Sequence, residues 1–346
     1  MSSADRVEHR NGCLTAWFGK REPIVPPPPN GGNDNGKGGE EPAMDSPPSI
    51  EVFAMPGHGR TSFLWSMLFM LRQLSRVWPG YLCWPLDQAT GRSLLEIHEK
   101  LRAGELPERS TSDQGKFTKF ALHLRNMNPW GERFFVVRDS PDGVFTAEKL
   151  NGASALPAVD WNRPALWLLS LSDLDEVRGR FLDLALDDLI RARHSSCEAA
   201  RQYPSRLMVV LTKGDALGDL PSGLRSFLKD DPLARELAES SGGLFRAHDG
   251  IDLAAAKRGL GTHDMPDPVG AYFESRRAID ALARDWLSSN SAGRALLGRA
   301  EELKVDLKLS VVSATGSGII SGGRLATAWS PRRVLDPYFW ALELGA

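Results

Sequence analysis

The chain has 346 residues, 42% of them hydrophobic, and a formal net charge of −2 at pH 7. This length and composition suffice to bury a full core in one large domain or two modest ones. A nearly neutral chain gives no reason to expect a nucleic-acid partner or binding to a charged membrane surface. The three cysteines (Cys13, Cys83 and Cys197) match no metal-ligand or disulfide pattern, so we expect a reduced, cytoplasmic setting.

The N-terminal region is predicted to be a disordered tail over residues 1–48, because it is rich in Pro, Gly and Asn and has little to bury. Within it, CLTAWFGK at 13–20 is either a short docking segment or a few stray apolar residues. The N-terminus lacks the apolar core of a signal peptide. The most apolar stretch, FLWSMLFML at 63–71, is too short to span a bilayer, so we expect a buried helix and no membrane span.

From residue 49 onward, short apolar runs alternate with helical patterns. Buried strands are predicted at 50–55, 133–139, 164–171, 206–213 and 305–314, and a weaker, alternating run at 120–127 fits an edge strand. Helices are predicted at 61–78, 92–103, 175–201, 222–239, 270–302 and 334–343. This alternation predicts an α/β fold with a mostly parallel sheet and helices on both faces.

The segment AMPGHGRTS at 54–62 connects the first strand to the first helix and is similar to the phosphate-binding pattern G-x-x-x-x-G-K-[ST]. Gly57 and Gly59 are small where backbone N–H groups must approach phosphates closely. Ala54 stands where the pattern has its first glycine. Thr61 is a candidate Mg²⁺ ligand, and Ser62 follows it. A Gly-rich turn without a ligand is the alternative reading of this segment.

Two further side chains of this loop leave alternatives open. Arg60 stands where the pattern has lysine, and its planar head is not equivalent to an ammonium. It either holds the phosphates from a different angle or blocks the γ-phosphate position. His58 either contacts phosphate or is an exposed loop side chain.

Two later segments are typical of guanine recognition. LTKGD at 211–215 fits the pattern [NT]-K-x-D, in which Asp215 accepts hydrogen bonds from N1–H and the exocyclic amine of guanine. Lys213 would lie along the base, and Thr212 takes a place often held by Asn. VVSATGSG at 311–318 resembles an S-A-[KTL] element whose backbone binds the guanine oxygen. The candidate residues of this element are Ser313, Ala314 and Thr315. Taken alone, LTKGD also fits a polar strand end and VVSAT a plain Ser-Ala-Thr turn, and it is their order after the phosphate loop that favours guanine recognition.

A third segment, FFVVRDSPDG at 134–143, ends a strand with Asp139, which is placed to hold Mg²⁺ through water. The related pattern D-x-x-G has its glycine one position earlier than Gly143. Either the loop bulges by one residue or Asp142 shares the role. Val144 follows where a water-orienting glutamine would stand. We therefore expect slow hydrolysis, or hydrolysis assisted by another chain.

A polar stretch, LRAGELPERSTSD at 101–113, lies between the phosphate loop and Asp139. Thr111 is the candidate for completing the Mg²⁺ shell in the triphosphate state, with Ser110 and Ser112 as competitors. The alternative is a flexible polar loop without a metal role.

These elements, each at a predicted strand end and in this order, resemble a TRAFAC-class P-loop GTPase domain. The GELPERST stretch and the C-terminal PYFWAL helix make the chain similar to the bacterial double-GTPase proteins of predicted conflict or signalling systems. The resemblance implies a GTPase-like domain at 49–346 with a helical insertion at about 217–303, before the last strand. That insertion is either extra core helices or a surface for a partner, such as a second GTPase.

The resemblance also implies GTP or GDP with Mg²⁺ as ligands and a protein partner that binds through the switch loops or the insertion. The expected function is a guanine-nucleotide-binding switch with slow or partner-assisted GTP hydrolysis. Whether the chain is an enzyme stays open, because the departures at Ala54, Arg60, Gly143 and Val144 affect hydrolysis more than binding. The alternative is a scaffold of the same fold without turnover. An ATP-dependent kinase or ATPase is disfavoured by LTKGD.

Overall fold

The structure is a computed structural model that describes residues 49–54, 57–78, 81–106, 118–139, 164–171, 174, 186–187, 206–215, 220–239, 265–316, 319–320, 324–325 and 329–344. The tail predicted at 1–48 and most of the helix predicted at 175–201 lie outside these ranges. So do Thr111 and Gly143, whose proposed roles stay predictions.

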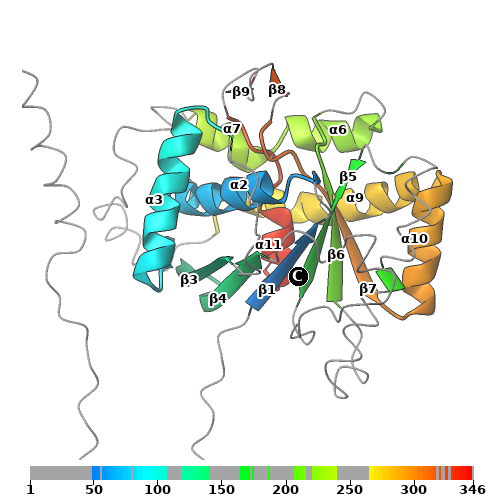
Figure 1. The fold of residues 1–346 in the computed structure, drawn as a ribbon, viewed down its shortest axis with the longest axis horizontal. Coiled ribbons are helices and arrows are strands. Elements are labelled where there is room, and N and C mark those ends of the chain that lie inside the picture. The colour runs from blue at the N-terminus through cyan, green and yellow to red at the C-terminus, as the bar shows by residue number, and fades with distance from the viewer. Residues whose placement is uncertain are drawn as a thin grey trace, which may run out of the picture. The chain divides into compact units, whose positions relative to one another are not determined.

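The described chain builds a seven-stranded sheet in the order β2-β3-β4-β1-β5-β6-β7 (Figure 1). Its strands are β1 (Ser49–Ala54), β2 (Leu82–Pro85), β3 (Thr118–Met127), β4 (Gly131–Asp139), β5 (Ala165–Ser170), β6 (Arg206–Thr212) and β7 (Asp306–Val311). Strands β4, β1, β5, β6 and β7 pair in parallel, and β3 and β2 extend the sheet in antiparallel fashion. A separate two-stranded ribbon joins β8 (Ile319–Ile320) to β9 (Arg324–Leu325).

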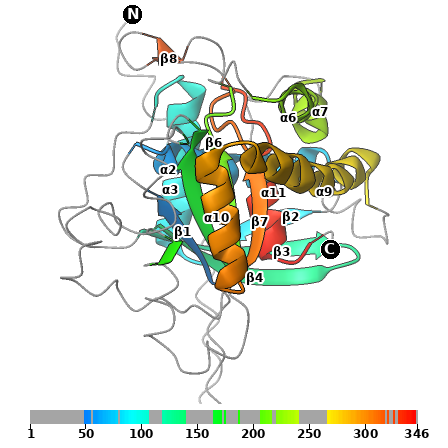
Figure 2. The same cartoon turned by 90° about the vertical axis from the view of Figure 1, so that its right-hand side faces the viewer.

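The helices are α2 (Arg60–Gln73) with the 3₁₀ turn η1 (Leu74–Arg76), α3 (Gln88–Arg102), α6 (Ser222–Lys229), α7 (Pro232–Glu239), α9 (Asp267–Ser288), α10 (Ser291–Glu302) and α11 (Asp336–Ala341). Four of these described helices, α6 to α10, lie between β6 and β7, in the interval predicted to be a helical insertion. Figure 2 shows α9 and α10 beside β7, at one edge of the sheet.

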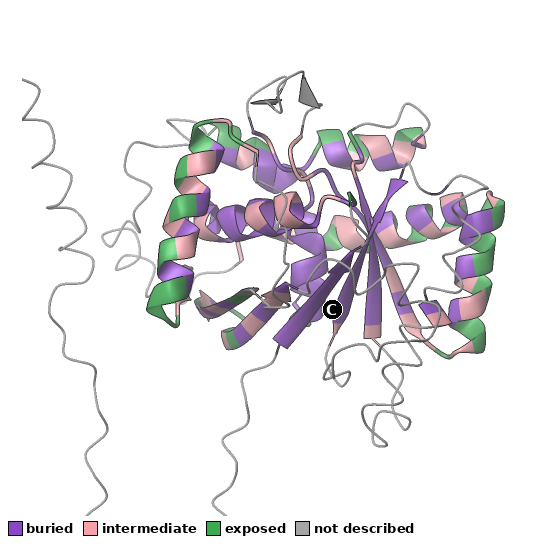
Figure 3. Ribbon diagram, in the orientation of Figure 1, coloured by how far each residue is buried: buried purple, intermediate pink, exposed green. Residues whose placement is uncertain are grey.

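The core has two halves, one on each face of the sheet, because successive strand residues point to opposite faces. Residues such as Val52 of β1 belong to one cluster, which includes buried side chains of α2, α3, α7 and α11. Phe53 and Trp167 belong to the other, with buried side chains of α6 and α10. Strands β1 and β5 are buried along their whole length (Figure 3). The predicted fold class, an α/β fold with helices on both faces of a mostly parallel sheet, is confirmed.

The structure corrects the prediction at three places. Strand β3 is not at the edge of the sheet, because the short strand β2, which was not predicted, pairs outside it. The helix predicted at 222–239 is two helices, and Asp231 starts the second by accepting the amides of Leu233 and Ala234. The helix predicted at 270–302 is also two, and the Asn290 side chain caps α10 by accepting the Gly293 amide at 2.6 Å.

Candidate functional site

The sequence motifs meet at one edge of the sheet. The Gly57–Gly59 loop follows β1, Asp139 ends β4, LTKGD follows β6 and VVSATG follows β7. Because these strands are parallel, their carboxyl ends lie together, and Figure 1 shows the loop between β1 and α2 at that edge. Strand β1 has β4 on one side and β5 on the other, so the strand order reverses at β1. In open α/β sheets, ligands bind outside the carboxyl ends of the strands at such a point.

The loop after β1 has the backbone that close approach to an anion requires. Gly57 and Gly59 have φ angles of 87° and 79°, a region that side chains rarely adopt. Gly59 is the N-cap of α2, so no side chain caps this helix, and its first turn contains no acidic residue. The first amides of a helix have no acceptor within it and carry partial positive charge. This loop is therefore suited to bind phosphate.

One of the two alternatives for His58, an exposed loop side chain, is excluded, and its contact with phosphate stays a prediction. Its side chain is buried, so it is not an exposed loop residue. The ring Nδ1 lies 3.1 Å from the Ser170 amide, which donates to it, and 3.2 Å from the Leu168 carbonyl oxygen. Pairing between β1 and β5 ends at Ala54 and Leu168, and His58 bonds to β5 just beyond that point. The ring therefore attaches the loop to β5.

Thr212 connects the LTKGD segment to the same loop. Its buried hydroxyl lies 2.9 Å from the His58 carbonyl oxygen and 3.2 Å from the Leu169 carbonyl oxygen. A hydroxyl has one proton, so it donates to one of these acceptors at a time. In either state the threonine holds the carboxyl end of β6 against the neighbouring loop or strand.

Arg60 and Asp139 form a buried ion pair inside the candidate site. Arg60 Nε lies 2.6 Å from Asp139 Oδ1, and the two side chains are only 5% and 11% exposed. The contact follows from the sheet, because Asp139 lies beside Val52 in the pairing of β4 with β1. The arginine that replaces the usual lysine thus pairs with the carboxylate predicted to hold Mg²⁺. Thr61, the other described Mg²⁺ candidate, follows Arg60 and is half-buried, as is Ser62.

The two segments predicted to recognise guanine, LTKGD and VVSATG, are joined by side chain and backbone. Ser313 donates its hydroxyl proton to Asp215 Oδ1, and the Ser313 hydroxyl oxygen accepts the Gly316 amide at 3.0 Å. The Gly214 amide donates to the Val312 carbonyl oxygen at 3.1 Å. Asp215 is exposed. Lys213 has a φ angle of 62°, which turns the chain sharply at the end of β6.

Two residues that were not predicted hold the segment after β7 in place beside the phosphate loop and LTKGD. Ser66 of α2 donates to the Ala314 carbonyl oxygen and so links the phosphate-loop helix to the segment after β7. Its signal in the sequence is a single serine in the otherwise apolar stretch FLWSMLFML. Gly316 has a φ angle of 70°, and a side chain there would meet the Ser330 carbonyl oxygen at 1.7 Å. Only glycine fits this turn.

The structure thus brings together the predicted residues of the loop, Asp139 and the two base-recognition segments. It includes no group of three or more His, Cys, Asp or Glu side chains that could hold a metal ion among the described residues. No described helix is both long and apolar enough to cross a membrane.

No protein-family model matches the chain, and no curated protein matches it. Among solved structures, it is similar to a chain of the "Signal recognition particle receptor SRb-GTP/SRX complex from Chaetomium thermophilum", with 12% sequence identity and a TM-score of 0.34. The similarity covers 79% of this chain and 93% of that chain. At this identity and TM-score it carries no argument about function, which has to come from the residues of the site.

Proposed function

We propose that the protein is a guanine-nucleotide-binding switch with slow or partner-assisted GTP hydrolysis. The observation that carries the proposal is the contact of Asp215 with Ser313, because it joins the two segments that would surround a guanine base. The phosphate loop is joined to the same corner through Thr212 and Ser66. A carboxylate at this place accepts from N1–H and the amine of guanine, and adenine offers neither donor there.

Each part of the site has a role in this proposal. The amides at the start of α2 would bind the phosphates, and the base would lie between Lys213 and the segment 313–315. Mg²⁺ would be held by Thr61 and, through water, by Asp139. These oxygen donors suit that ion. Thr111 would join them in the triphosphate state.

The Arg60–Asp139 ion pair gives a physical reason for slow turnover. In this structure the positive charge of Arg60 already neutralises the carboxylate. Full engagement of Mg²⁺ by Asp139 therefore has to compete with a buried ion pair, whose separation costs free energy unless both partners find new ones. Nucleotide phosphates would supply the new partner for Arg60. The site would then have two states that differ in the partner of Arg60.

A partner protein would bind the loops that respond to the γ-phosphate or the helices between β6 and β7. Because Val144 cannot orient water, a partner would also supply what hydrolysis lacks. We expect the protein to act in the cytoplasm. We also propose that it is a member of the double-GTPase group.

The test is calorimetric titration of the purified full chain with GTP, GDP and ATP, with and without Mg²⁺. We expect micromolar binding of both guanine nucleotides, little binding of ATP, and loss of guanine binding in Asp215→Ala. The matched control is Asp285→Ala, since Asp285 is an exposed aspartate of α9, outside the site. Equal binding of ATP and GTP, or guanine binding that survives Asp215→Ala, would overturn the proposal.

A scaffold without turnover is the second candidate, and the same ion pair favours it. Because Arg60 and Asp139 already neutralise each other, neither charge needs a ligand to compensate it. The scaffold predicts no heat with any nucleotide from a folded sample. In that case the helices α6 to α10 would form the functional surface.

A further inference from the structure

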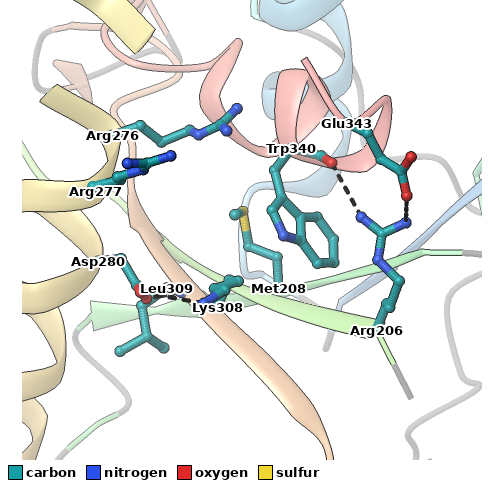
Figure 4. Close-up of a pocket in the computed structure, with 9 residues that line it drawn as sticks. All are labelled: Arg206, Met208, Arg276, Arg277, Asp280, Lys308, Leu309, Trp340 and Glu343. Carbon is teal, nitrogen blue, oxygen red and sulfur yellow. Dashed lines mark hydrogen bonds and ion pairs between the residues drawn. The ribbon is translucent and has the colours of Figure 1, made fainter. Parts of the chain in front are cut away.

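A cavity lies at the opposite end of β6 from the candidate nucleotide site. It has a volume of about 500 Å³ and lies between α9, α11 and the strands β6 and β7 (Figure 4). Arg206, on its wall, is the first residue of β6, and Thr212 is the last. A strand of this length separates the two sites by about 20 Å. This volume lies in the range of small-molecule sites.

The walls of the cavity carry an excess of positive charge. Four cations, Arg206, Arg276, Arg277 and Lys308, line it with two carboxylates, Asp280 and Glu343. Each carboxylate forms an ion pair with one of the cations. Glu343 lies 2.7 Å from Arg206, and Asp280 lies 4.0 Å from Lys308.

Two of the four cations, Arg276 and Arg277, are neighbours on α9. Arg276 donates to the Leu344 carbonyl oxygen at 2.8 Å, and the Asp336 carboxyl also acts on its charge. Burial lowers the pKa of Arg276, which shows that its charge is held at a cost in solvation. Arg277 is exposed and makes no hydrogen bond or ion pair within the described part of the chain. Figure 4 shows both guanidinium groups on the α9 side of the cavity.

The floor of the cavity is apolar. Met208 and Trp340 are both buried, and their side chains lie between the α9 arginines and Arg206 in Figure 4. The Arg206 guanidinium lies 5.1 Å from the centre of the Trp340 ring, a cation–π contact that fixes the indole in place. A ligand here would meet positive charge on one side and a fixed aromatic surface next to it.

We propose that this cavity binds a small organic anion, with a phosphate or carboxylate group beside a flat apolar group. Arg276 and Arg277 would bind the anionic group, and Met208 and Trp340 would contact the apolar group. Arginine is suited to this task because its planar fork binds both anions in the same two-pronged way. The inference stands independently of the proposed nucleotide site.

The experiment is an NMR titration of the full chain that follows the indole N–H signal of Trp340, identified by its loss in Trp340→Phe. The probes are phenyl phosphate, benzoate, inorganic phosphate and phenol. We expect phenyl phosphate or benzoate to shift this signal in a saturable way, with weaker binding of inorganic phosphate and phenol. The better of the two aromatic anions identifies the preferred anionic group. An anion bound only at the phosphate loop would leave this signal unchanged.

The variant that tests the charge is Arg277→Gln, because Arg277 is exposed and its replacement leaves the fold intact. We expect the dissociation constant of the best probe to rise about fivefold or more, the scale of one charge-assisted hydrogen bond. The matched control is Arg235→Gln, which removes an exposed arginine of α7 and should leave the constant unchanged. The proposal is overturned if no probe shifts the Trp340 signal, or if both variants have the same effect.

Discussion

The Thr212 hydroxyl shows how much one atom organises this site, since its two acceptors belong to the phosphate loop and to β5. Thr212→Val keeps the shape of the side chain and removes the hydroxyl. We expect it to lower the free energy of unfolding by about 1 kcal/mol, the usual net value of one hydrogen bond. We also expect weaker guanine binding, because the loop loses its link to LTKGD. Thr212→Ser, which keeps the hydroxyl, should retain binding; equal loss in Val and Ser variants would contradict the role given to the hydroxyl.

The Arg60–Asp139 ion pair leads to a prediction about the effect of Mg²⁺ on GTP binding. Because Arg60 neutralises Asp139, Mg²⁺ should strengthen GTP binding only slightly in the natural chain. Arg60→Met removes the charge and frees the carboxylate, although it also removes a cation that would bind phosphate. The informative quantity is therefore the ratio of GTP affinities with and without Mg²⁺. We expect this ratio to rise about tenfold, within the usual range of coupling between two ligands. Titration calorimetry measures it, and an unchanged ratio would show that Arg60 and Mg²⁺ do not compete.

Among the elements, α11 is held by a buried charge network rather than by apolar contacts alone. Arg333 Nε and Nη2 donate to Asp336 at 2.8 and 2.7 Å, and both side chains are almost fully buried. The guanidinium also lies 3.7 Å from the centre of the Tyr272 ring. The Arg333 backbone amide donates to Asp231, the residue that starts α7. This network fastens α11 to α7 and α9.

The pH dependence of this network tests how deeply Asp336 is buried. Burial raises the pKa of Asp336 from 3.8 to about 6, while Arg333 opposes the rise. Asp231 and Arg276 also face this carboxyl, and Asp231 raises its pKa while Arg276 lowers it. The folded state therefore binds the proton more tightly than the unfolded state. The stability that protonation of Asp336 adds to the folded state is complete below pH 3.8. It is lost as the pH rises through about 6.

Asp336→Asn should lower the free energy of unfolding by about 3 to 5 kcal/mol at pH 7, since it leaves the buried Arg333 charge without its partner. The asparagine variant has no proton to bind. The gap between the natural chain and the variant should therefore be wider at pH 5 than at pH 7, by about 1 kcal/mol. Urea unfolding at both pH values measures the gap, with Asp285→Asn as an exposed control. A gap that narrows at pH 5 would mean that the pKa of Asp336 is not raised.

The sequence predicted the buried strands well because a fully buried parallel strand needs a continuous apolar run, as in ALWLLS of β5. It missed β2, because LCWP has four residues and its strand character depends on pairing with β3. The helix breaks were missed although they have local signals. Asp231 followed by Pro232, and Asn290 after two serines, are typical helix starts that apolar periodicity alone hides.

At the scale of the whole molecule, the order of the motifs along the chain was enough to predict that they share one edge of the sheet. The side-chain contacts between the motifs were not predictable, since they join segments that are distant in the sequence. The pairing of Arg60 with Asp139 requires β4 beside β1, and the inward turn of His58 requires β5 to continue beyond the end of β1. The cavity at the far end of β6 gathers residues from α9, α11, β6 and β7, and no local pattern marks it.

The same connectivity makes a prediction for the stability of the whole chain. The candidate site joins β1, α2, β6 and β7, so a bound guanine nucleotide should stabilise the fold as a unit. A ligand present at about 100 times its dissociation constant adds about 2.7 kcal/mol to the free energy of unfolding. In a protein of this size that should raise the melting temperature by at least about 4 °C. Differential scanning calorimetry should show the rise with GTP and GDP.

Three comparisons separate a working site from a scaffold in that measurement. ATP at the same concentration should raise the melting temperature much less than GTP, because Asp215 finds no matching donors on adenine. Asp215→Ala should abolish the rise with GTP, and Asp285→Ala should retain it. A chain that unfolds at the same temperature with and without every nucleotide does not bind them, since any ligand selective for the folded state must raise its stability. That result would exclude the switch, assign the Arg60–Asp139 pair a purely structural role and leave the proposed anion cavity unaffected.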